Sequence, residues 1–198
     1  DGIRLLPDGR PMNIIVETAG EDTEQTDVLE LVHDGWAEVG IKLFTKPSQR
    51  EVFRNRIFSG ETLISIWGGF ENGLPTAGMN PAELAPTSQQ SLQWPKWGQF
   101  FETKGQAGEA PDLPKAKELA DLNGQWLVST DDATRADIWQ QMLQIHADET
   151  FSIGIVSGVM QPVVASGKLR NIPAEAVYNW DPGAMFGIYR PDTFYYEK

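Results

Sequence analysis

The sequence predicts an α/β fold in which a mixed, mostly parallel β-sheet is flanked by helices. Apolar residues switch between strand-like and helix-like spacing along residues 12–67, and the predicted elements follow as strand, helix, strand, helix, strand. In this order each helix connects neighbouring parallel strands and covers the sheet. The 198 residues suffice for one domain with a buried core, or for a large piece of a longer protein.

The first three elements follow an opening arm that contains two Asp-Gly turns. Residues 12–18 are rich in β-branched side chains and predict a strand. Apolar residues recur at helical spacing over 28–39, and Gly40 follows as a C-terminal stop signal. Residues 41–46 alternate apolar with polar or basic side chains, as a half-buried strand does, and Pro47 ends the run.

A second helix and a third strand complete the predicted sheet. Ser48 and Glu51 have the Ser-x-x-Glu spacing of a capping box, in which each side chain bonds the other residue's backbone N–H. Apolar residues at helical spacing continue to Phe58, and Gly60 marks the end of the helix. Residues 62–67 then predict the third strand.

A long segment of weak periodicity, residues 71–114, follows this sheet. Gly, Pro, Ser, Gln and aromatic residues dominate it, with at most short helical pieces near 81–84 and 97–104. A segment of this length within a compact domain is typically functional, disordered or an insertion. The aromatic residues between Trp94 and Phe101 argue against disorder.

Regular structure resumes with two predicted helices. The first begins near Asp112 or Leu113, and the second is predicted to be capped by Thr130. Residues 151–166 predict one or two strands, interrupted by glycine and proline. The aromatic, turn-rich tail that follows has no strong periodicity.

The composition excludes several classes of function. Lys and Arg total 16 against 28 Asp and Glu, so the net charge of -12 repels nucleic acid, which we do not expect as a partner. The absence of cysteine excludes disulfides, thiolate catalysis and Cys-ligated metals. No apolar run approaches membrane-spanning length and no leader pattern is present, so we expect neither a transmembrane helix nor a signal peptide in this chain, which is either processed or cut.

Catalytic motifs are scarce. The two histidines, His33 and His146, lie in different predicted helices without the i, i+4 partner of a zinc-binding helix, so we interpret both as structural or solvent-facing. Neither a Gly-x-Ser-x-Gly nucleophile elbow nor a phosphate-binding loop occurs. We therefore predict no catalytic residue, no metal and no cofactor, and a protein that is not an enzyme.

The seven tryptophans divide into two groups by position. Three fall on predicted helices and are expected in the core: Trp36, Trp126 and Trp139. Four others lie at strand ends or in loops beside Gly or Pro: Trp67, Trp94, Trp97 and Trp180. For these four, ligand contact competes with packing of the long segment.

The stretch SIWGGFENG, residues 65–73, follows the third predicted strand and has the composition of a binding loop. Its tryptophan and phenylalanine offer apolar walls, the two glycines between them let backbone amides approach a ligand, and the Glu-Asn pair offers hydrogen bonds. An aromatic turn that merely anchors the long segment is the alternative. The predicted ligand-binding residues are Trp67, Gly68, Gly69, Phe70, Glu71, Asn72, Trp94, Trp97 and Trp180.

Four strings occur in a fixed order along the chain: RLLPDGRPMNIIVET, WAEVGIKL, REVFRNRIFSGETLISIWGGFENG and, later, IHADE ahead of FSIGIV. This ordered set resembles the C-terminal half of bacterial extracellular solute-binding proteins of family 5, the dipeptide-, oligopeptide- and nickel-binding components of ABC importers. Two departures stand out. The string GGFENGLPTAGMNP replaces the family's Asp-Pro continuation, so a peptide ligand is not assumed, and the family's N-terminal lobe is missing.

The resemblance implies a type II periplasmic-binding-protein lobe, with residues 1–157 as the second ligand-binding lobe and residues 158–198 as the segment that returns to the first lobe. It implies capture of a small solute, an oligopeptide or similar, in an interlobe cleft and delivery to the permease subunits of an ABC transporter. A periplasmic, or extracellular and membrane-associated, location and a monomeric full-length protein follow from the same resemblance.

Three alternatives stay open from the residues alone. An oligosaccharide suits loop tryptophans with Glu, Asn and Gln nearby as well as a peptide does. Glu71 and Asp181 are each flanked by aromatic residues and would serve as the acid pair of a glycan hydrolase. A stand-alone interaction module, docking through the aromatic tail, is the third.

Overall fold

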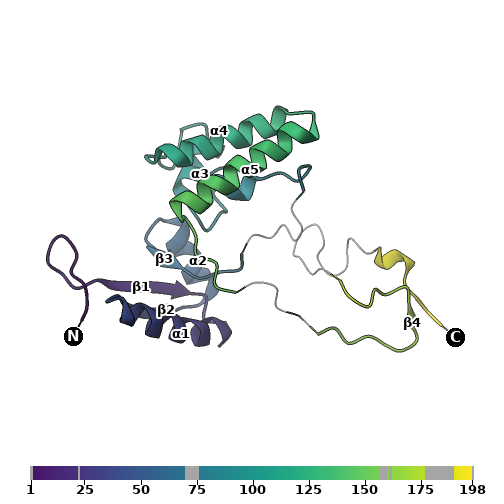
Figure 1. Cartoon of the computed structure of the whole chain (residues 1–198), viewed down its shortest axis with the longest axis horizontal. Coiled ribbons are helices and arrows are strands. Elements are labelled where there is room, and N and C mark those ends of the chain that lie inside the picture. Colours follow the sequence, from purple (N-terminus) through teal and green to yellow (C-terminus); the bar gives the residue numbers. More distant parts are fainter. Residues whose placement is uncertain are drawn as a thin grey trace. The chain divides into compact units, whose positions relative to one another are not determined.

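The computed structural model describes residues 2–21, 23–69, 76–156, 160, 162–176 and 190–197. The chain divides into two compact units, and Figure 1 shows helices and strands of both. Unit 1 comprises Asp1–Trp67 and Pro86–Lys117, and unit 2 comprises Gly68–Ala85 and Glu118–Lys198.

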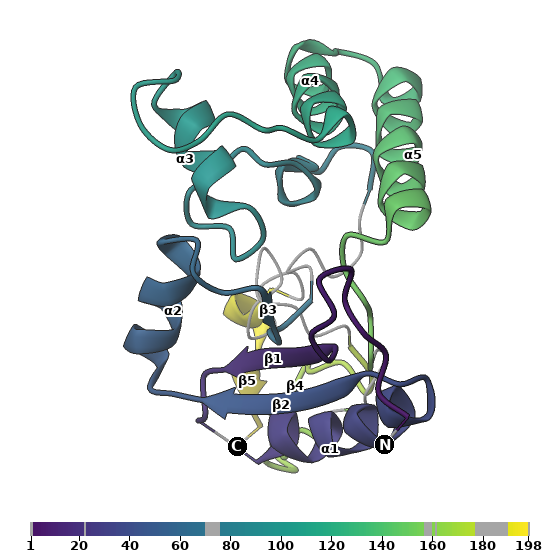
Figure 2. The same cartoon turned by 90° about the vertical axis from the view of Figure 1, so that its left-hand side faces the viewer.

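Unit 1 is built on a three-stranded parallel sheet. Its strands are β1 (Asn13–Thr18), β2 (Lys42–Pro47) and β3 (Ile64–Ser65), in the order β2-β1-β3. Figure 2 shows the three strands side by side. The crossover helices are α1 (Glu24–Glu38) and α2 (Arg50–Phe58), so the predicted alternation of strands and helices and the parallel sheet are confirmed.

The two crossover helices cover opposite faces of this sheet. Val16 packs with Leu29 of α1 and Leu43 of β2 in one core cluster. The next residue, Glu17, points to the other face and bonds Arg56 of α2. Burial of an aliphatic side chain such as Leu29, which is 2% exposed, contributes roughly 1.5–3 kcal/mol. The sheet is therefore held in place by apolar contacts on the α1 side and partly by charge on the α2 side.

The second core cluster of unit 1 lies beneath α2. Ala19, Phe53 and Ile57 are buried there, and Trp67 packs against them. Helix α3 (Pro95–Glu102) contacts α2 and begins with Pro95 at its first turn. This cluster positions the end of β3 against the first turns of α2.

Unit 2 has mainly helices among its described regular elements. It contains a short 3₁₀ helix η1 (Ala82–Leu84), most of α4 (Pro114–Val128) and α5 (Asp132–Glu149), with α4 and α5 side by side in Figures 1 and 2. Its remaining elements are short: β4 (Leu169–Arg170) and β5 (Tyr195–Tyr196) form an antiparallel pair, and η3 (Pro191–Thr193) precedes β5.

Side chains from α4 and α5 hold residues 76–85 in place through main-chain carbonyls. The indole N–H groups of Trp126 and Trp139 donate to the carbonyls of Ala77 at 3.0 Å and Met79 at 2.8 Å. The ring nitrogen Nε2 of His146 lies 2.8 Å from a third carbonyl, that of Leu84 in η1. Trp126 and Trp139 are buried, which confirms both as core residues, and the structural interpretation of His146 is confirmed as well.

Two predicted helix caps are wrong. Ser48 does not cap α2: the N-cap is Gln49, without a side-chain cap bond, because the extended backbone reaches one residue further before the helix begins. Thr130 does not cap α5: Asp131 does, its carboxylate accepting a 2.8 Å hydrogen bond from the Thr134 N–H. A carboxylate is the better cap here because its charge also favours the positive end of the helix dipole.

The strand predictions need two corrections. The third strand is shorter than residues 62–67, since only Ile64 and Ser65 pair with β1. The described residues within 151–166 form no strand, although their sequence is apolar and β-branched, and Ile153, Val156 and Val164 are exposed there. Strand propensity without a pairing partner does not make a strand.

Candidate functional site

The carboxyl ends of the three parallel strands meet at one edge of the unit 1 sheet. Open α/β sheets place their ligands at such an edge. The loops after β1 and β2 are tied together there, because the Ser48 N–H donates to the Thr18 carbonyl at 3.1 Å. Gly20 has φ of +62°, and a Cβ at this position would lie 3.1 Å from the Ser48 oxygen, so the close approach of the two loops favours glycine. Trp67 follows the third strand at the same edge.

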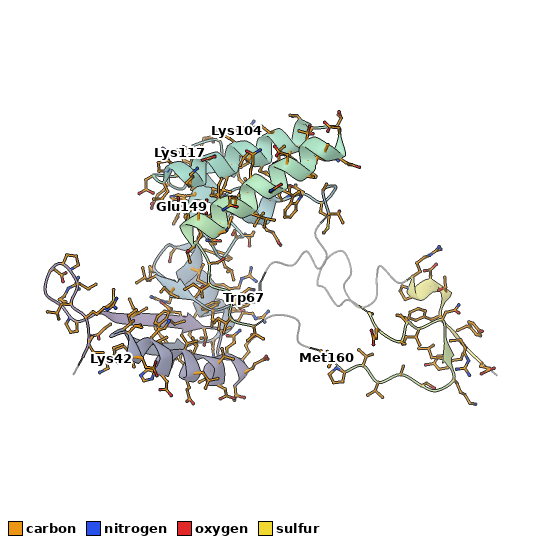
Figure 3. All side chains as sticks on the ribbon, viewed as in Figure 1. Lys42, Trp67, Lys104, Lys117, Glu149 and Met160 are labelled. Atoms are coloured by element: carbon orange, nitrogen blue, oxygen red, sulfur yellow. The ribbon has the colours of Figure 1, made fainter. Side chains whose placement is uncertain are left out.

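Trp67, which is labelled in Figure 3, is half-buried and packs against helix α2. Its ring stacks on Phe53, with 5.6 Å between ring centroids and 19° between planes. The guanidinium carbon of Arg50 lies 5.3 Å from the ring centroid, a cation–π distance. The indole N–H of Trp67 has no hydrogen-bond partner among the described residues. The ring is therefore anchored through its apolar surface, and its donor is not used within the described part of the chain.

Arg50 is itself held by Glu21 from the loop after β1. Its Nε donates to Glu21 Oε1 at 2.7 Å, and its Nη2 contacts Glu21 Oε2. This hydrogen bonding raises the pKa of Arg50, so the guanidinium stays charged. The Arg50 guanidinium that faces the Trp67 ring is thus paired with the Glu21 carboxylate.

Glu17, at the end of the central strand, is a buried carboxylate with two cationic partners. Arg56 donates to its two oxygens from Nε at 2.7 Å and from Nη2 at 2.8 Å, and the Lys46 Nζ lies 3.5 Å from Oε2. The hydrogen bonds from Arg56 hold the pKa of Glu17 below its usual value, although burial opposes them. Glu61 also pairs with Arg56, at 2.8 Å. Glu17 is therefore ionised at neutral pH and has no proton to donate as a general acid.

The other predicted ligand-binding residues divide into three sets. Trp94 and Trp97 stack on each other with centroids 5.6 Å apart at the start of α3, and both are half-buried. Gly68 and Gly69 are exposed, and no atom of the described residues lies within 4 Å of a Cβ placed at either residue, so the described part of the chain leaves their backbone open to approach. Four predicted ligand contacts and one proposed acid lie outside the described residues: Phe70, Glu71, Asn72, Trp180 and Asp181.

Sequence reasoning missed the charged residues of this edge. The pair Glu21–Arg50 spans 29 residues and the pair Glu17–Arg56 spans 39, which local patterns do not reveal. One signal was present: an acidic residue, Glu17, inside an apolar β-branched run is costly unless it is paired. The partner, however, is only visible in the fold.

Hollows also occur elsewhere on the described surface, and two of them are well defined by their lining. One, of about 470 Å³ in unit 2, follows a stripe of α5 from Ala136 to Ala147 and is bounded by Thr76 and Ala77. The other, of about 120 Å³ in unit 1, is lined by Phe58, Pro95 and four polar side chains. Neither is lined by a residue predicted from the sequence to bind ligand.

The described residues contain neither a metal-binding cluster nor a membrane-spanning helix. No three or more His, Asp or Glu side chains there gather into a group that would hold a metal ion. None of the described helices combines the length and apolar character needed to cross a membrane.

Comparison with known proteins identifies the fold. No protein-family model matches the sequence, and no curated protein matches it. Solved structures do match. The oligopeptide-binding protein OppA aligns with 100% of this chain and 32% of its own length, at a TM-score of 0.73 and 21% identity.

Two further structures match with similar identity. The periplasmic binding protein MelB from Agrobacterium fabrum C58, in complex with stachyose, covers 78% of this chain at a TM-score of 0.64 and 20% identity, with 23% of its own length aligned. NikA from Brucella suis, in complex with Fe(III)-EDTA, covers 76% at a TM-score of 0.53 and 21% identity, with 27% of its own length aligned.

The chain thus has the α/β fold of part of a periplasmic binding protein. Its structural neighbours are periplasmic solute-binding proteins of the family 5 type, which confirms the resemblance noted in the sequence at the level of the fold. The chain spans about a third or less of the length of these neighbours.

Proposed function

We propose that this chain is most of the second lobe of a family 5 solute-binding protein, the substrate-binding component of an ABC importer. One observation carries the proposal: a half-buried tryptophan, Trp67, stands at the carboxyl edge of a parallel sheet with its N–H donor unused by the described residues. The chain captures a small solute without covalent chemistry, and a permease receives it. Periplasmic location, permease partners and a monomeric full-length protein belong to the same proposal.

The proposed site combines the stretch that follows β3 with two further aromatic positions. Trp67 supplies an apolar wall and a hydrogen-bond donor, and Gly68 and Gly69 expose backbone amides. The stacked pair Trp94–Trp97 supplies a second aromatic surface. Phe70, Glu71, Asn72 and Trp180 complete the proposed set.

The proposed division of the chain into two segments follows from the resemblance to family 5 solute-binding proteins. Residues 1–157 form the second ligand-binding lobe, and residues 158–198 return to the first lobe of the longer protein. The ligand is then held between two lobes, and closure is a population shift driven by contacts to both. This chain by itself should accordingly bind the solute weakly or not at all.

The ligand is proposed to be an oligopeptide or a similar small solute, with an oligosaccharide as the alternative. Strand-like hydrogen bonds to a peptide backbone and stacking of sugar rings on indole surfaces both suit the residues at this edge. Two described carboxylates at this edge, Glu17 and Glu21, are each paired with an arginine, Arg56 and Arg50, which supports a binding role in place of acid catalysis.

Isothermal titration calorimetry tests this proposal. The full-length polypeptide that contains these residues is titrated with di-, tri- and tetrapeptides and with stachyose, and this chain is titrated in parallel. Binding by the longer protein, weakened about tenfold or more in Trp67→Ala, is expected. Phe44→Ala serves as the control, because Phe44 is an exposed aromatic of the same sheet, 44% exposed.

Two results would contradict the proposal. If no peptide and no sugar binds, the solute-binding role has no support. If these 198 residues bind with the affinity of the longer protein, the two-lobe site is wrong.

A further inference from the structure

Arg50 stands between a carboxylate and the ring that is proposed to contact the ligand. We propose that Arg50 is a positioning residue that sets the orientation of the Trp67 indole, and that Glu21 holds Arg50 in place for this purpose. The inference rests on the proposed function, because it assigns a role to a ring placed in the proposed site. It adds two residues to the determinants of ligand binding, Glu21 from the loop after β1 and Arg50 from the first turn of α2.

The geometry links the three segments that follow the strands at the carboxyl edge of the sheet. Arg50 begins α2 and meets the Trp67 ring at 5.3 Å from the guanidinium carbon. The same guanidinium contacts both oxygens of Glu21, 29 residues earlier. A bidentate guanidinium–carboxylate pair fixes the plane of the guanidinium, whereas a single contact leaves it free to rotate. The plane that faces the ring is therefore set by Glu21.

Stability alone does not account for this arrangement. The side chains of Arg50 and Glu21 are 52% and 45% exposed, and an ion pair this exposed contributes little to folding. The folding contribution at this position comes from Phe53, which is fully buried and stacks on the same ring. Arg50 thus contacts the ring where it reaches solvent, and Phe53 contacts it where it meets the core.

The arrangement also argues against direct binding of a ligand carboxylate by Arg50. Its Nε and Nη2 are already engaged by Glu21, and the bond to Glu21 raises its pKa. A second anion would have to displace Glu21 or share the guanidinium with it. Arg50 therefore acts on the ligand through Trp67.

Helix α2 offers a matched control. Arg54 lies over the Phe58 ring with the same separation, 5.3 Å from guanidinium carbon to centroid. Arg54→Met removes a cation–π contact from the same helix and leaves Trp67 untouched. Arg50→Lys keeps the charge and loses the planar fork, so it separates charge from geometry.

The test is ¹⁹F NMR of the chain labelled with 5-fluorotryptophan, which gives one resonance for each of the seven tryptophans. The Trp67 resonance is assigned by its loss in Trp67→Phe. Arg50→Met is expected to shift or broaden this resonance, with smaller changes of the same sign in Glu21→Gln and Arg50→Lys and none in Arg54→Met. A Trp67 resonance that stays unmoved in Arg50→Met overturns the proposal.

The second measurement is the affinity of the longer protein for whichever peptide it binds, or for stachyose. Arg50→Met is expected to weaken binding about two- to fivefold, the range of one exposed cation–π contact, and Arg54→Met is expected to leave it unchanged. Abolished binding without a change of the Trp67 resonance would show that Arg50 contacts the ligand itself, and would also overturn the proposal. The NMR measurement needs no ligand. If the longer protein binds none of the peptides and no stachyose, the solute-binding role is refuted, but the NMR result on Arg50 and Trp67 remains valid.

Discussion

Replacing Glu17 by glutamine removes the negative charge from a carboxylate that is 3% exposed, while the shape of the side chain is nearly kept. In the folded protein this carboxylate accepts two hydrogen bonds from Arg56, at 2.7 and 2.8 Å, and lies 3.5 Å from Lys46. Glu17→Gln retains one acceptor oxygen. It therefore turns a paired buried charge into a neutral group beside two cations.

The expected cost follows from burial. Breaking a fully buried ion pair costs about 3–5 kcal/mol. Here the Arg56 side chain is 29% exposed, and Arg56 keeps Glu61 as a partner at 2.8 Å, so both water and a second carboxylate compensate part of the loss. We expect Glu17→Gln to lower the free energy of unfolding by about 1.5–3 kcal/mol, the range of hydrogen bonds to charged groups.

Glu61→Gln is the matched control, because it removes the other carboxylate of the same arginine. The Glu61 side chain is 59% exposed, so this change should cost about 0–1 kcal/mol. Urea denaturation at pH 7, followed by circular dichroism, measures both values. Equal costs for the two variants would refute the role given to burial.

The same substitution predicts a pH dependence. The folded-state pKa of Glu17 lies below its ordinary value of 4.5, so its contribution is fully present above the unfolded pKa and is lost as pH falls through the folded pKa. The stability gap between the natural chain and Glu17→Gln should therefore be constant from pH 7 to about pH 5 and narrow at lower pH. A gap that keeps its full size down to about pH 3 would contradict the assigned cause.

Three further tests, two of them with a control substitution, probe the packing and the cap of α5 by thermal or urea denaturation. Phe53→Ala removes a fully buried ring and should lower the free energy of unfolding by about 3–5 kcal/mol. Its control, Val52→Ala, lies at a neighbouring site that is 48% exposed and should change this free energy by about 0.5 kcal/mol or less. Similar losses in the two variants would contradict the assignment of Phe53 to the core. Gly98→Ala places a Cβ 2.0 Å from the backbone oxygen of Ser88 and should lower the free energy of unfolding by several kcal/mol. Its control, Gly124→Ala, meets no atom of the described residues within 4 Å and should raise that free energy by about 0.5–1 kcal/mol. An unchanged stability in Gly98→Ala would show that the loop around Ser88 moves to make room for the methyl group. Asp131→Ala removes the cap of α5 and should cost about 1 kcal/mol, and no loss would refute the cap.

Part of the candidate site was accessible to sequence reasoning. Trp67 was identified because it ends a strand beside two glycines, and the structure finds it half-buried at the carboxyl edge of the sheet. Trp94 and Trp97 were identified separately, and the structure adds that they stack on each other. The groups that orient Trp67, namely Arg50 and Glu21, carried no local signal because their pairing spans 29 residues.

Helix caps show where local patterns fail. The Ser48–Glu51 spacing satisfied the pattern of a capping box, yet the backbone remains extended through Gln49 and the helix begins at Arg50. A capping pattern specifies which bonds are possible, but the packing of the preceding loop decides which residue takes the cap. Contacts of the Ser48 backbone with Thr18 hold that loop in its place.

By itself, the sequence determined the alternation of strands and helices from β1 to β3, a mostly parallel sheet and the position of Trp67 after β3. These depend on periodicity and on short-range chirality rules, which act within one or two elements. The tertiary structure alone decided that Glu17 is a paired anion, that Arg50 faces Trp67 and that the apolar residues 153–156 make no strand. Each of these depends on which partner lies across a strand, a loop or a helix, and such partners are brought together only when the chain folds.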